Sequence, residues 1–409
     1  MGTDCLKYAC LFGGGAIRGA AHAGVVKAME ELGIQYDTVA GSSVGSIVAA
    51  LLAAGFNADE LKEIFLKVNF ELFKDIHLGF GNQFAISKGE VFLEWIRELI
   101  EKKYYGSSYV KGKNKPVTFA DMKKNLVIIT TNLSDFTCKE FSKSKTPDYE
   151  IAAAVKISSS MPGLMKPVEY ENSLLVDGDL QKSWPMWRLT DTLLNLEERI
   201  LEVRLEGDYG GDDMNVVNYF NTVYSCVTSF ATDFVLDRYI KNDKYDFIVV
   251  NTGDVIIIDF NQPEEKREHL MEIGYNQTIK YFKKYLPEKK DRIFEIYDNL
   301  YSQFNKINRA VHSNKIQKAK MILYETYAFL CENMCYIDPN EYLRIKEFKN
   351  IFIENIKYPA LFGNISFKSR KSVKEKSENI TDMLFNKLTD LRNYDKTIKN
   401  SLDNQPDFS

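Results

Sequence analysis

Two strand-like segments, each followed by glycine and then by a helical pattern, fill the start of this sequence and limit its possible folds. Apolar residues 8–12 lead into the glycine run 13–15, and apolar residues then recur at helical spacing over 17–32. The same order returns with a short run at 37–40 that contains β-branched Thr38 and Val39, then Gly41, and then a run of small and apolar residues at 43–52. Consecutive strand–helix units predict an α/β fold with a mainly parallel sheet covered by helices.

Strand and helix patterns continue to alternate as far as about residue 290. Beyond it, charged helical segments follow one another with few strand signals. We therefore predict an α/β domain over 1–290 and an all-helical C-terminal extension of unknown role over 291–409. The further strands are expected at 126–131, 174–176, 200–204 and 247–251, and the helices at 59–68, 88–103, 148–157, 264–285, 291–310 and 316–335.

Composition removes several classes of protein. Apolar residues make up 45% of the 409 residues, which excludes a disordered chain, and 53 basic against 57 acidic residues exclude a nucleic-acid partner bound through a broadly basic surface. Six cysteines form no disulfide framework in so long a chain, and no signal-like segment opens it, so we expect a cytoplasmic protein. The longest apolar stretch, 47–56, is about half a membrane-spanning length, so any membrane association is expected to be peripheral.

The segment Gly41-Ser42-Ser43-Val44-Gly45 matches the pattern Gly-X-Ser-X-Gly and lies between a predicted strand and a predicted helix. In this context the pattern is typical of a nucleophilic serine in a tight turn, with Gly41 and Gly45 removing Cβ atoms that would clash. The N-terminus of the following helix would favour a developing negative charge beside Ser43. The alternative is that Ser43 only caps a helix in a turn of small residues.

The glycine-rich loop 13–19 also joins a strand to a helix, so its amides can bind an anion. One interpretation is a dinucleotide site, because the glycine spacing is a loose fingerprint and Asp37 follows about twenty residues later. That interpretation leaves the serine turn unexplained. As an oxyanion hole upstream of a nucleophile on the adjacent strand, the loop and the serine turn explain each other.

A base for the serine has to come from elsewhere in the sequence. A Ser-Asp-His order would require His269 or His312, and both fall in charged or polar helical patterns. The alternative base is Asp177, which follows the apolar strand 174–176 and precedes Gly178. A buried carboxylate can serve as a base where an oxyanion hole stabilises most of the transition-state charge, although an Asp-Gly pair is also a common turn.

Together these residues resemble the patatin-like phospholipase family over about residues 6–190. The segments 19–28, 41–45, 130–133 and 158–163 are similar to the first helix, the nucleophile turn, the middle strand and the Ser-X-X-Pro-Gly turn of that family. The resemblance implies a three-layer α/β/α fold, a Ser-Asp dyad and cleavage of acyl esters of glycerolipids.

Residue by residue, the resemblance assigns Ser43 as nucleophile and Asp177 as base. It assigns the oxyanion donors to the glycine loop, at Gly13, Gly14, Gly15 and Ala16. Arg18 is expected to support the loop, either as a brace or by attracting a phosphate head group, with an ordinary ion pair at the helix start as the alternative.

One departure from the family pattern lies beside the base. The family has Asp-Gly-Gly or Asp-Gly-Ala where this chain has Asp177-Gly178-Asp179, so a second carboxylate comes close to the first. The effect of Asp179 on the dyad stays open at this point.

The sequence therefore predicts a lipid acyl hydrolase of the phospholipase A type, with a phospholipid or another lipid ester as substrate. Neither a metal nor an organic cofactor is implied. Two alternatives remain: a non-catalytic lipid-binding or regulatory protein on the same fold, and an intracellular thioesterase or small-ester hydrolase. The oligomeric state stays open.

Overall fold

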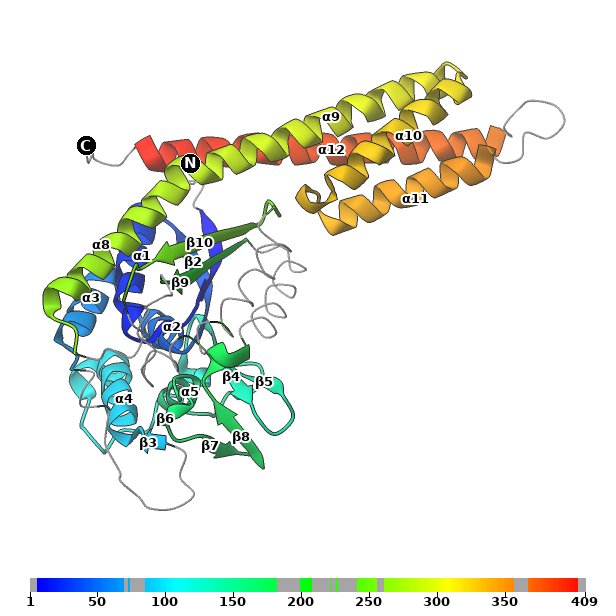
Figure 1. Cartoon of the computed structure of the whole chain (residues 1–409). Coiled ribbons are helices and arrows are strands. Elements are labelled where there is room, and N and C mark those ends of the chain that lie inside the picture. Colours follow the sequence, from blue (N-terminus) through cyan, green and yellow to red (C-terminus); the bar gives the residue numbers. More distant parts are fainter. Residues whose placement is uncertain are drawn as a thin grey trace. The chain divides into compact units, whose positions relative to one another are not determined.

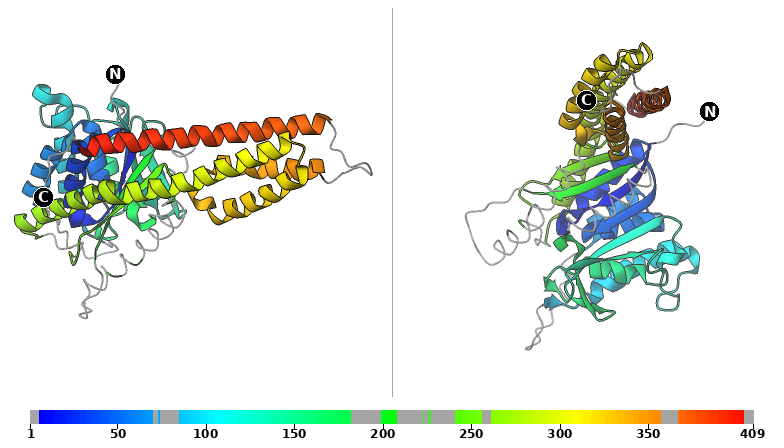
Figure 2. Two further views of the ribbon diagram at one scale, coloured as in Figure 1. Left: turned by 90° about the horizontal axis from the view of Figure 1, so that it is seen from above. Right: turned by 90° about the vertical axis from the view of Figure 1, so that its right-hand side faces the viewer.

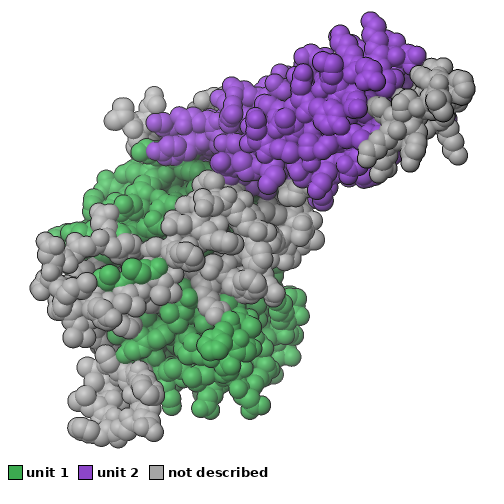
Figure 3. All heavy atoms as spheres, turned by 45° about the vertical axis from the view of Figure 1, so that its right-hand side comes forward, with its two compact units in different colours: residues 1–240, 244–281 green, residues 241–243, 282–409 purple. Residues whose placement is uncertain are grey.

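The computed structural model describes residues 6–69, 73, 85–181, 199–207, 222, 226, 241–255, 261–356 and 367–403. The chain divides into two compact units (Figure 3): residues 1–240 with 244–281, and residues 241–243 with 282–409. The division falls in a continuous helical run, where α8 (Glu264–Lys280) passes through one π-helical turn (Tyr281–Tyr285) into α9 (Leu286–His312). It lies a few residues before the boundary expected from the sequence at residue 290.

The first unit is built around an eight-stranded sheet with the order β10-β9-β1-β2-β4-β8-β7, in which β5 also pairs with β4 (Figure 1). The five strands from β10 to β4 run parallel, whereas β5, β8 and β7 pair in antiparallel fashion. A two-stranded sheet pairs β3 with β6. The strand bounds are β1 Lys7–Phe12, β2 Gln35–Ser42, β3 Ala85–Ser87, β4 Asn125–Asn132, β5 Thr137–Ser142, β6 Gly163–Met165, β7 Val168–Tyr170, β8 Ser173–Val176, β9 Ile200–Glu206 and β10 Tyr245–Asn251.

Helices cover this sheet, and its central strands are buried along nearly their whole length. In β1, β4 and β9 almost every residue is buried, which requires cover on both faces of the sheet. The predicted α/β/α architecture with a mainly parallel sheet is therefore confirmed. The helices are α1 Ala20–Glu31, α2 Val44–Ala54, α3 Ala58–Lys67, α4 Glu90–Tyr105, α5 Ile151–Ser158 and α8.

The helix α1 packs against α8 at close range. A Cβ at Gly24 of α1 would overlap the main chain of Met271, and one at Gly274 of α8 would overlap the main chain of Ala21. The helix α2 packs instead on β1, β2 and β4 and is buried along most of its length. It ends where Gly55 takes a left-handed conformation, φ 97°.

The strands β2 and β8 approach each other along one edge of β4. One edge of β4 is taken by β5 over residues 127–132, so β2 and β8 share the other edge. There Ser42 of β2 lies beside Ile129, and Val176 of antiparallel β8 lies beside Thr131. The residue that follows each strand therefore reaches the same level of β4 from opposite directions.

The second unit is helical in its described part, as predicted for the C-terminal region (Figure 2). It contains α9, α10 (Ile316–Glu332), α11 (Pro339–Ile356) and α12 (Phe367–Asp403), and α9 packs against both α10 and α12. Its own apolar core includes Tyr297, Leu300, Phe304, Leu330 and Phe348. Among the described residues of the whole chain, none of the helices combines the length and the apolar character needed to span a bilayer.

Candidate active site

Ser43 lies in the turn between β2 and α2 with an unusual backbone conformation. Its φ of 51° and ψ of −129° put a non-glycine residue in a costly region, and the side chain is 4% exposed. The turn closes tightly because a Cβ at Gly41 would overlap Gly45 O, and a Cβ at Gly45 would overlap Phe12 O. Both glycines of the sequence pattern are therefore required by close approach of the main chain.

Asp177 follows β8 and meets Ser43 at the level of β4 described above. Ser43 Oγ donates a hydrogen bond to Asp177 Oδ2 at 2.7 Å, and the carboxylate is fully buried. The other oxygen, Oδ1, accepts a hydrogen bond from Asp179 N at 2.7 Å. Gly178 passes so close to Ile129 O that a Cβ would overlap it. Two residues 134 positions apart are thus brought together as a hydroxyl–carboxylate pair.

The main chain of Ser43 is held by hydroxyl groups that sequence analysis did not single out individually. Ser43 N donates to Ser158 Oγ at 3.0 Å, and Ser158 Oγ donates to Ile129 O at 2.6 Å. Ser46 Oγ donates to Ser43 O at 2.6 Å. Ser158 belongs to the run 158–163 that carries part of the family resemblance, but its contact with Ser43 is a tertiary one. These bonds satisfy the polar groups of the strained turn.

The amides of the glycine loop have different partners. Gly13 N donates to Val203 O at 2.8 Å, as part of the sheet, and Gly14 N donates to Asp179 Oδ1 at 3.2 Å. The amides of Gly15 and Ala16 make no hydrogen bond within the described part of the chain, and both residues have positive φ, 153° and 49°. Two of the four expected oxyanion donors are therefore already engaged.

Asp179 connects its own turn, which also contains Asp177, with the serine turn and with the glycine loop. Its carboxylate is fully buried and, besides the Gly14 amide, its Oδ1 accepts a hydrogen bond from Ser42 Oγ at 2.5 Å. Gly14 must be glycine here, because a Cβ would overlap the Asp179 carboxylate and lie 2.7 Å from Ser43 Cβ.

Buried basic groups lie close to this cluster. His22 Nε2 is 2.8 Å from Gly13 O, and burial lowers the pKa of His22 to about 4, against the opposing effects of the Gly13 contact and of Asp179. Arg204 Cδ lies next to Gly13, and Arg204 pairs with Glu202 at 2.5 Å. Burial lowers the pKa of Arg204, but the charges of Glu202, Tyr245 and Asp179 together raise it above its ordinary value.

Arg18 is buried, and its guanidinium Nε donates to Val255 O at 2.8 Å. The guanidinium also lies so close to Gly207 that a Cβ there would overlap it. These contacts are those of a brace between the glycine loop and the segments after β9 and β10.

The histidines considered as alternative bases lie elsewhere. His269 has a 69% exposed side chain and faces Glu272 at 3.6 Å, and His312 faces Glu378 at 3.1 Å. Neither is a recorded partner of Ser43, whose hydroxyl bonds to Asp177. The structure thus pairs the Ser43 hydroxyl with a carboxylate and with neither of these histidines.

The dinucleotide interpretation fails on the position of Asp37. This residue lies near the start of β2 and pairs with Lys7, the first residue of β1, at 2.6 Å. The glycine loop follows the opposite end of β1, roughly 20 Å away at about 3.3 Å per residue. In addition, the described residues hold no group of three or more histidine, cysteine or acidic side chains arranged to bind a metal.

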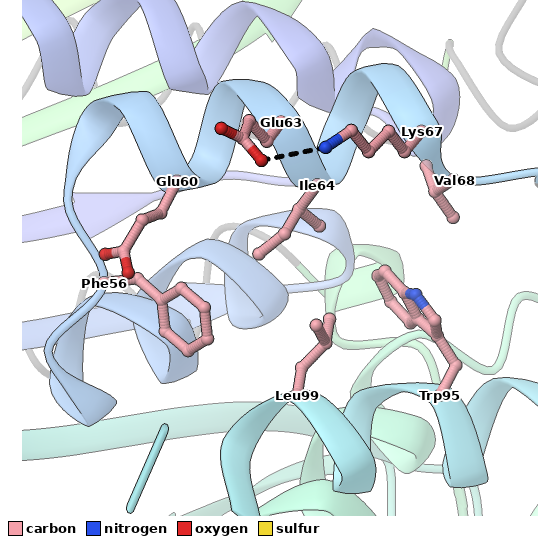
Figure 4. A pocket seen from close by; sticks show the side chains of 8 residues that line it. All are labelled: Phe56, Glu60, Glu63, Ile64, Lys67, Val68, Trp95 and Leu99. Atoms are coloured by element: carbon pink, nitrogen blue, oxygen red, sulfur yellow. Dashed lines mark hydrogen bonds and ion pairs between the residues drawn. The ribbon is translucent and has the colours of Figure 1, made fainter. Parts of the chain in front are cut away.

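A separate pocket of about 400 Å³ lies between α3 and α4 (Figure 4). Its apolar lining includes Ile64, Trp95 and Leu99, and its acidic residues are paired with lysines, Glu63 with Lys67 at 2.9 Å among them. None of its described lining residues belongs to the Ser43–Asp177 pair or to the glycine loop.

Several known sequences are similar to parts of this chain. An uncharacterized protein of Acanthamoeba polyphaga mimivirus is 28% identical over 286 residues, which are 66% of this chain and 91% of that protein. The uncharacterized protein YqhO of Bacillus subtilis is 22% identical over 67% of this chain and 98% of its own length. The lysophospholipase nte1 of Aspergillus fumigatus is 32% identical over 177 residues, which are 41% of this chain but 10% of that protein.

Two solved structures align with most of this chain at low sequence identity. VipD from Legionella pneumophila aligns with a TM-score of 0.48 and 14% identity over 90% of each chain. The type III effector protein ExoU aligns with a TM-score of 0.38 and 14% identity over 94% of this chain and 88% of its own.

The sequence model of a family described as patatin-like phospholipase matches residues 11–185, a range that contains β1, the glycine loop, the serine turn and Asp177. Over residues 11–185, this chain is therefore similar to patatin-like phospholipases.

Proposed function

We propose that this protein is a lipid acyl hydrolase of the phospholipase A type, which cleaves acyl esters of glycerophospholipids through Ser43 and Asp177. The observation that carries the proposal is the 2.7 Å hydrogen bond from Ser43 Oγ to Asp177 Oδ2, in a buried setting. A hydroxyl held by a carboxylate at this distance has a proton acceptor in place before substrate arrives.

In the first half of the reaction, Ser43 Oγ attacks the ester carbonyl carbon while its proton passes to Asp177. The carbonyl π-electrons move onto the oxygen, and the C–O bond to the glycerol then breaks. Asp177 returns the proton to the departing alkoxide, which leaves a lysolipid and an acyl-enzyme. In the second half, water gives a proton to Asp177 and attacks the acyl carbon. The bond between the acyl carbon and Ser43 Oγ then breaks, and Asp177 returns the proton to Ser43 Oγ, which releases the fatty acid and restores both residues.

The amides of Gly15 and Ala16 are the donors we propose for the oxyanion. Gly13 N is engaged with Val203 and Gly14 N with Asp179, whereas these two are without an acceptor among the described residues. The N-terminus of α2, which begins at Val44 next to the nucleophile, adds the positive end of a helix dipole.

A partly exposed apolar cluster supports an acyl chain as the substrate group. Ala16, Leu164 and Leu180 pack against buried Met161, and Ala16 belongs to the glycine loop while Leu180 directly follows Asp179. Apolar side chains next to the reacting groups suit a fatty acyl chain better than a charged or sugar substituent.

The test is hydrolysis of phosphatidylcholine vesicles with a labelled acyl chain by wild-type protein, Ser43→Ala and Asp177→Asn. Each substitution is expected to lower the rate by about a thousandfold or more, since each removes the nucleophile or its base. Ser107→Ala, at an exposed serine, is the matched control and should hydrolyse at the wild-type rate. Full activity in Ser43→Ala would remove the mechanism.

Two further measurements separate the alternative functions. A fluorophosphonate probe should label wild-type protein and leave Ser43→Ala unlabelled, whereas a non-catalytic scaffold would give no labelling at position 43 in either. A parallel assay with long-chain acyl-coenzyme A tests the thioesterase alternative, which predicts faster release from the thioester than from the phospholipid.

A further inference from the structure

Asp179 connects the three turns from which the proposed active site is assembled. Its amide donates to Asp177 Oδ1 at 2.7 Å, while its Oδ1 accepts from Ser42 Oγ at 2.5 Å and from Gly14 N at 3.2 Å. Ser42 directly precedes the nucleophile, and Gly14 lies in the middle of the glycine loop. One fully buried residue thus contacts the base, the nucleophile turn and the oxyanion loop.

The contact with Gly14 decides which amides are left for the oxyanion. An N–H group that donates to a carboxylate is not available to a second acceptor at full strength. With Gly13 N directed to Val203 O, the next amides along the loop are those of Gly15 and Ala16. Glycine tolerates the φ of 153° at position 15, but the φ of 49° at Ala16 is unusual for a residue with a Cβ and needs support from its surroundings.

The packing around Gly14 shows how closely the loop is held. A Cβ on Gly14 would overlap the Asp179 carboxylate, so the main chain of the loop lies directly against this side chain. On the neighbouring residue, a Cβ on Gly13 would lie 3.1 Å from Arg204 Cδ. Asp179 therefore fixes the loop relative to Ser43, and the basic Arg204 lies next to the same loop.

We propose that Asp179 is a positioning residue, which holds Ser42 and Gly14 so that the amides of Gly15 and Ala16, and not that of Gly14, form the oxyanion hole. This inference rests on the proposed function of Ser43 and Asp177. It gives the second carboxylate of the Asp-Gly-Asp turn a role in geometry, distinct from the proton transfer of Asp177.

The test compares Asp179→Ala, Asp179→Asn and Ser42→Ala in the full chain, with the soluble ester p-nitrophenyl butyrate as substrate. Asp179→Ala removes both side-chain hydrogen bonds and should lower kcat by about tenfold to a hundredfold, because a misplaced oxyanion hole loses transition-state stabilisation. KM should change less than about threefold, since the ground state of the ester makes little use of these donors.

The conservative variant separates positioning from simple folding. Asn at position 179 keeps an oxygen that can accept from both Ser42 and Gly14, so Asp179→Asn should retain kcat within about threefold of wild type. Ser42→Ala removes one of the two contacts and should fall between the two Asp179 variants. A purely structural role would instead lower the amount of folded protein and leave kcat per labelled active site unchanged, with active sites counted by fluorophosphonate titration.

The outcomes distinguish this inference from the proposed function. If Asp179→Ala folds and hydrolyses the ester as fast as wild type or faster, the positioning role is overturned, and a faster rate would mean that the carboxylate obstructs the Gly14 amide. If Asp179→Ala does not fold, an unchanged kcat in Ser42→Ala overturns it. If Ser43→Ala stays active, the proposed function fails first, whatever the Asp179 variants do.

Discussion

Ser43 N donates a hydrogen bond to Ser158 Oγ at 3.0 Å, which ties the nucleophile turn to the last residue of α5. Ser158 Oγ in turn donates a hydrogen bond to Ile129 O at 2.6 Å, so the hydroxyl bridges α5, β4 and the turn. This bridge satisfies the amide of a residue with positive φ, a conformation that needs support from its surroundings.

Ser158→Ala is therefore expected to destabilise the first unit and to lower activity. The change leaves the buried Ser43 amide without its acceptor, which costs about 1–3 kcal/mol in the free energy of unfolding. All three tryptophans of the chain lie within residues 1–240, so urea unfolding followed by tryptophan fluorescence reports on this unit.

Ser159→Ala is the matched control for this prediction. Ser159 is only partly buried, and its Oγ lies at 3.4 Å from Ser43 O, near the limit of a hydrogen bond. If Ser159→Ala lowers the free energy of unfolding as much as Ser158→Ala does, the Ser158 bridge does not have the stabilising role described here.

The elements predicted best from the sequence are those in which a short strand-like run is followed by glycine. The runs 8–12 and 37–40 correspond to β1 and β2, and the helix after each begins within a few residues of its expected start. The short strands β5 and β7 were missed, because they are antiparallel strands with few buried apolar side chains. Their structure comes from pairing with β4 and β8 more than from their own pattern.

The candidate site also contains residues that local sequence patterns predicted and contacts that they did not. Ser43 and Asp177 were predicted from local patterns, because Gly-X-Ser-X-Gly and Asp-Gly are patterns of neighbouring residues. No local sequence pattern predicts the contacts of Asp179, since they depend on β2 and β8 meeting along one edge of β4. For the same reason, the choice among the loop amides required the partners of Gly13 and Gly14 to be seen.

Gly14→Ala and Asp179→Ala are expected to be strongly coupled. The new Cβ at position 14 would overlap the Asp179 carboxylate, so Gly14→Ala alone should destabilise the first unit markedly. Removing the carboxylate relieves this overlap, and the double variant should lose less than the sum of the single losses by about 1–3 kcal/mol. The measurement is a double-mutant cycle on the free energy of unfolding, and additive losses would contradict the packing described here.

Leu180→Ala is expected to change acyl-chain preference. Leu180 packs with Ala16 and Leu164 against Met161, beside the glycine loop. A shorter side chain removes apolar contact with a long acyl group but not with a butyryl group, so kcat/KM for a long-chain ester should fall about tenfold more than that for p-nitrophenyl butyrate. Leu133→Ala, at an exposed leucine, is the control. Equal losses for both chain lengths would exclude an acyl contact at Leu180.

Lys387→Met is expected to loosen the second unit. Lys387 Nζ lies 2.7 Å from Asp243 Oδ2, and the two side chains are only 10% and 5% exposed. Removing one partner of a buried ion pair costs up to about 3–5 kcal/mol. Hydrogen exchange of α9 and α12 amides should then speed up. Lys376→Met, on the same helix, removes an exposed pair with Glu347 and should cost less than about 1 kcal/mol.

The pH dependence of the Lys387 pair has a definite sign. Burial lowers the pKa of Lys387, but Asp243 and Glu341 outweigh it and raise that pKa above 10.5. The unfolded chain therefore releases this proton first as the pH rises, and the stabilisation is present below pH 10.5 and is lost above it. If the hydrogen-exchange protection of the α12 amides in the wild type does not fall in alkaline solution, the pairing is contradicted.

His22 is expected to make the first unit less stable in mildly acidic solution. Burial lowers its pKa in the folded chain to about 4 from 6.5, so the unfolded chain takes up the proton first as the pH falls. Stability is then constant above pH 6.5 and decreases from there towards pH 4, by on the order of 3 kcal/mol for this group. His22→Gln keeps a donor for Gly13 O but does not titrate, so its free energy of unfolding should fall less over this range. The control is His269→Gln, at an exposed histidine, whose free energy of unfolding should change with pH as that of the wild type does. If His22→Gln shows that same pH dependence, the acid sensitivity does not come from His22.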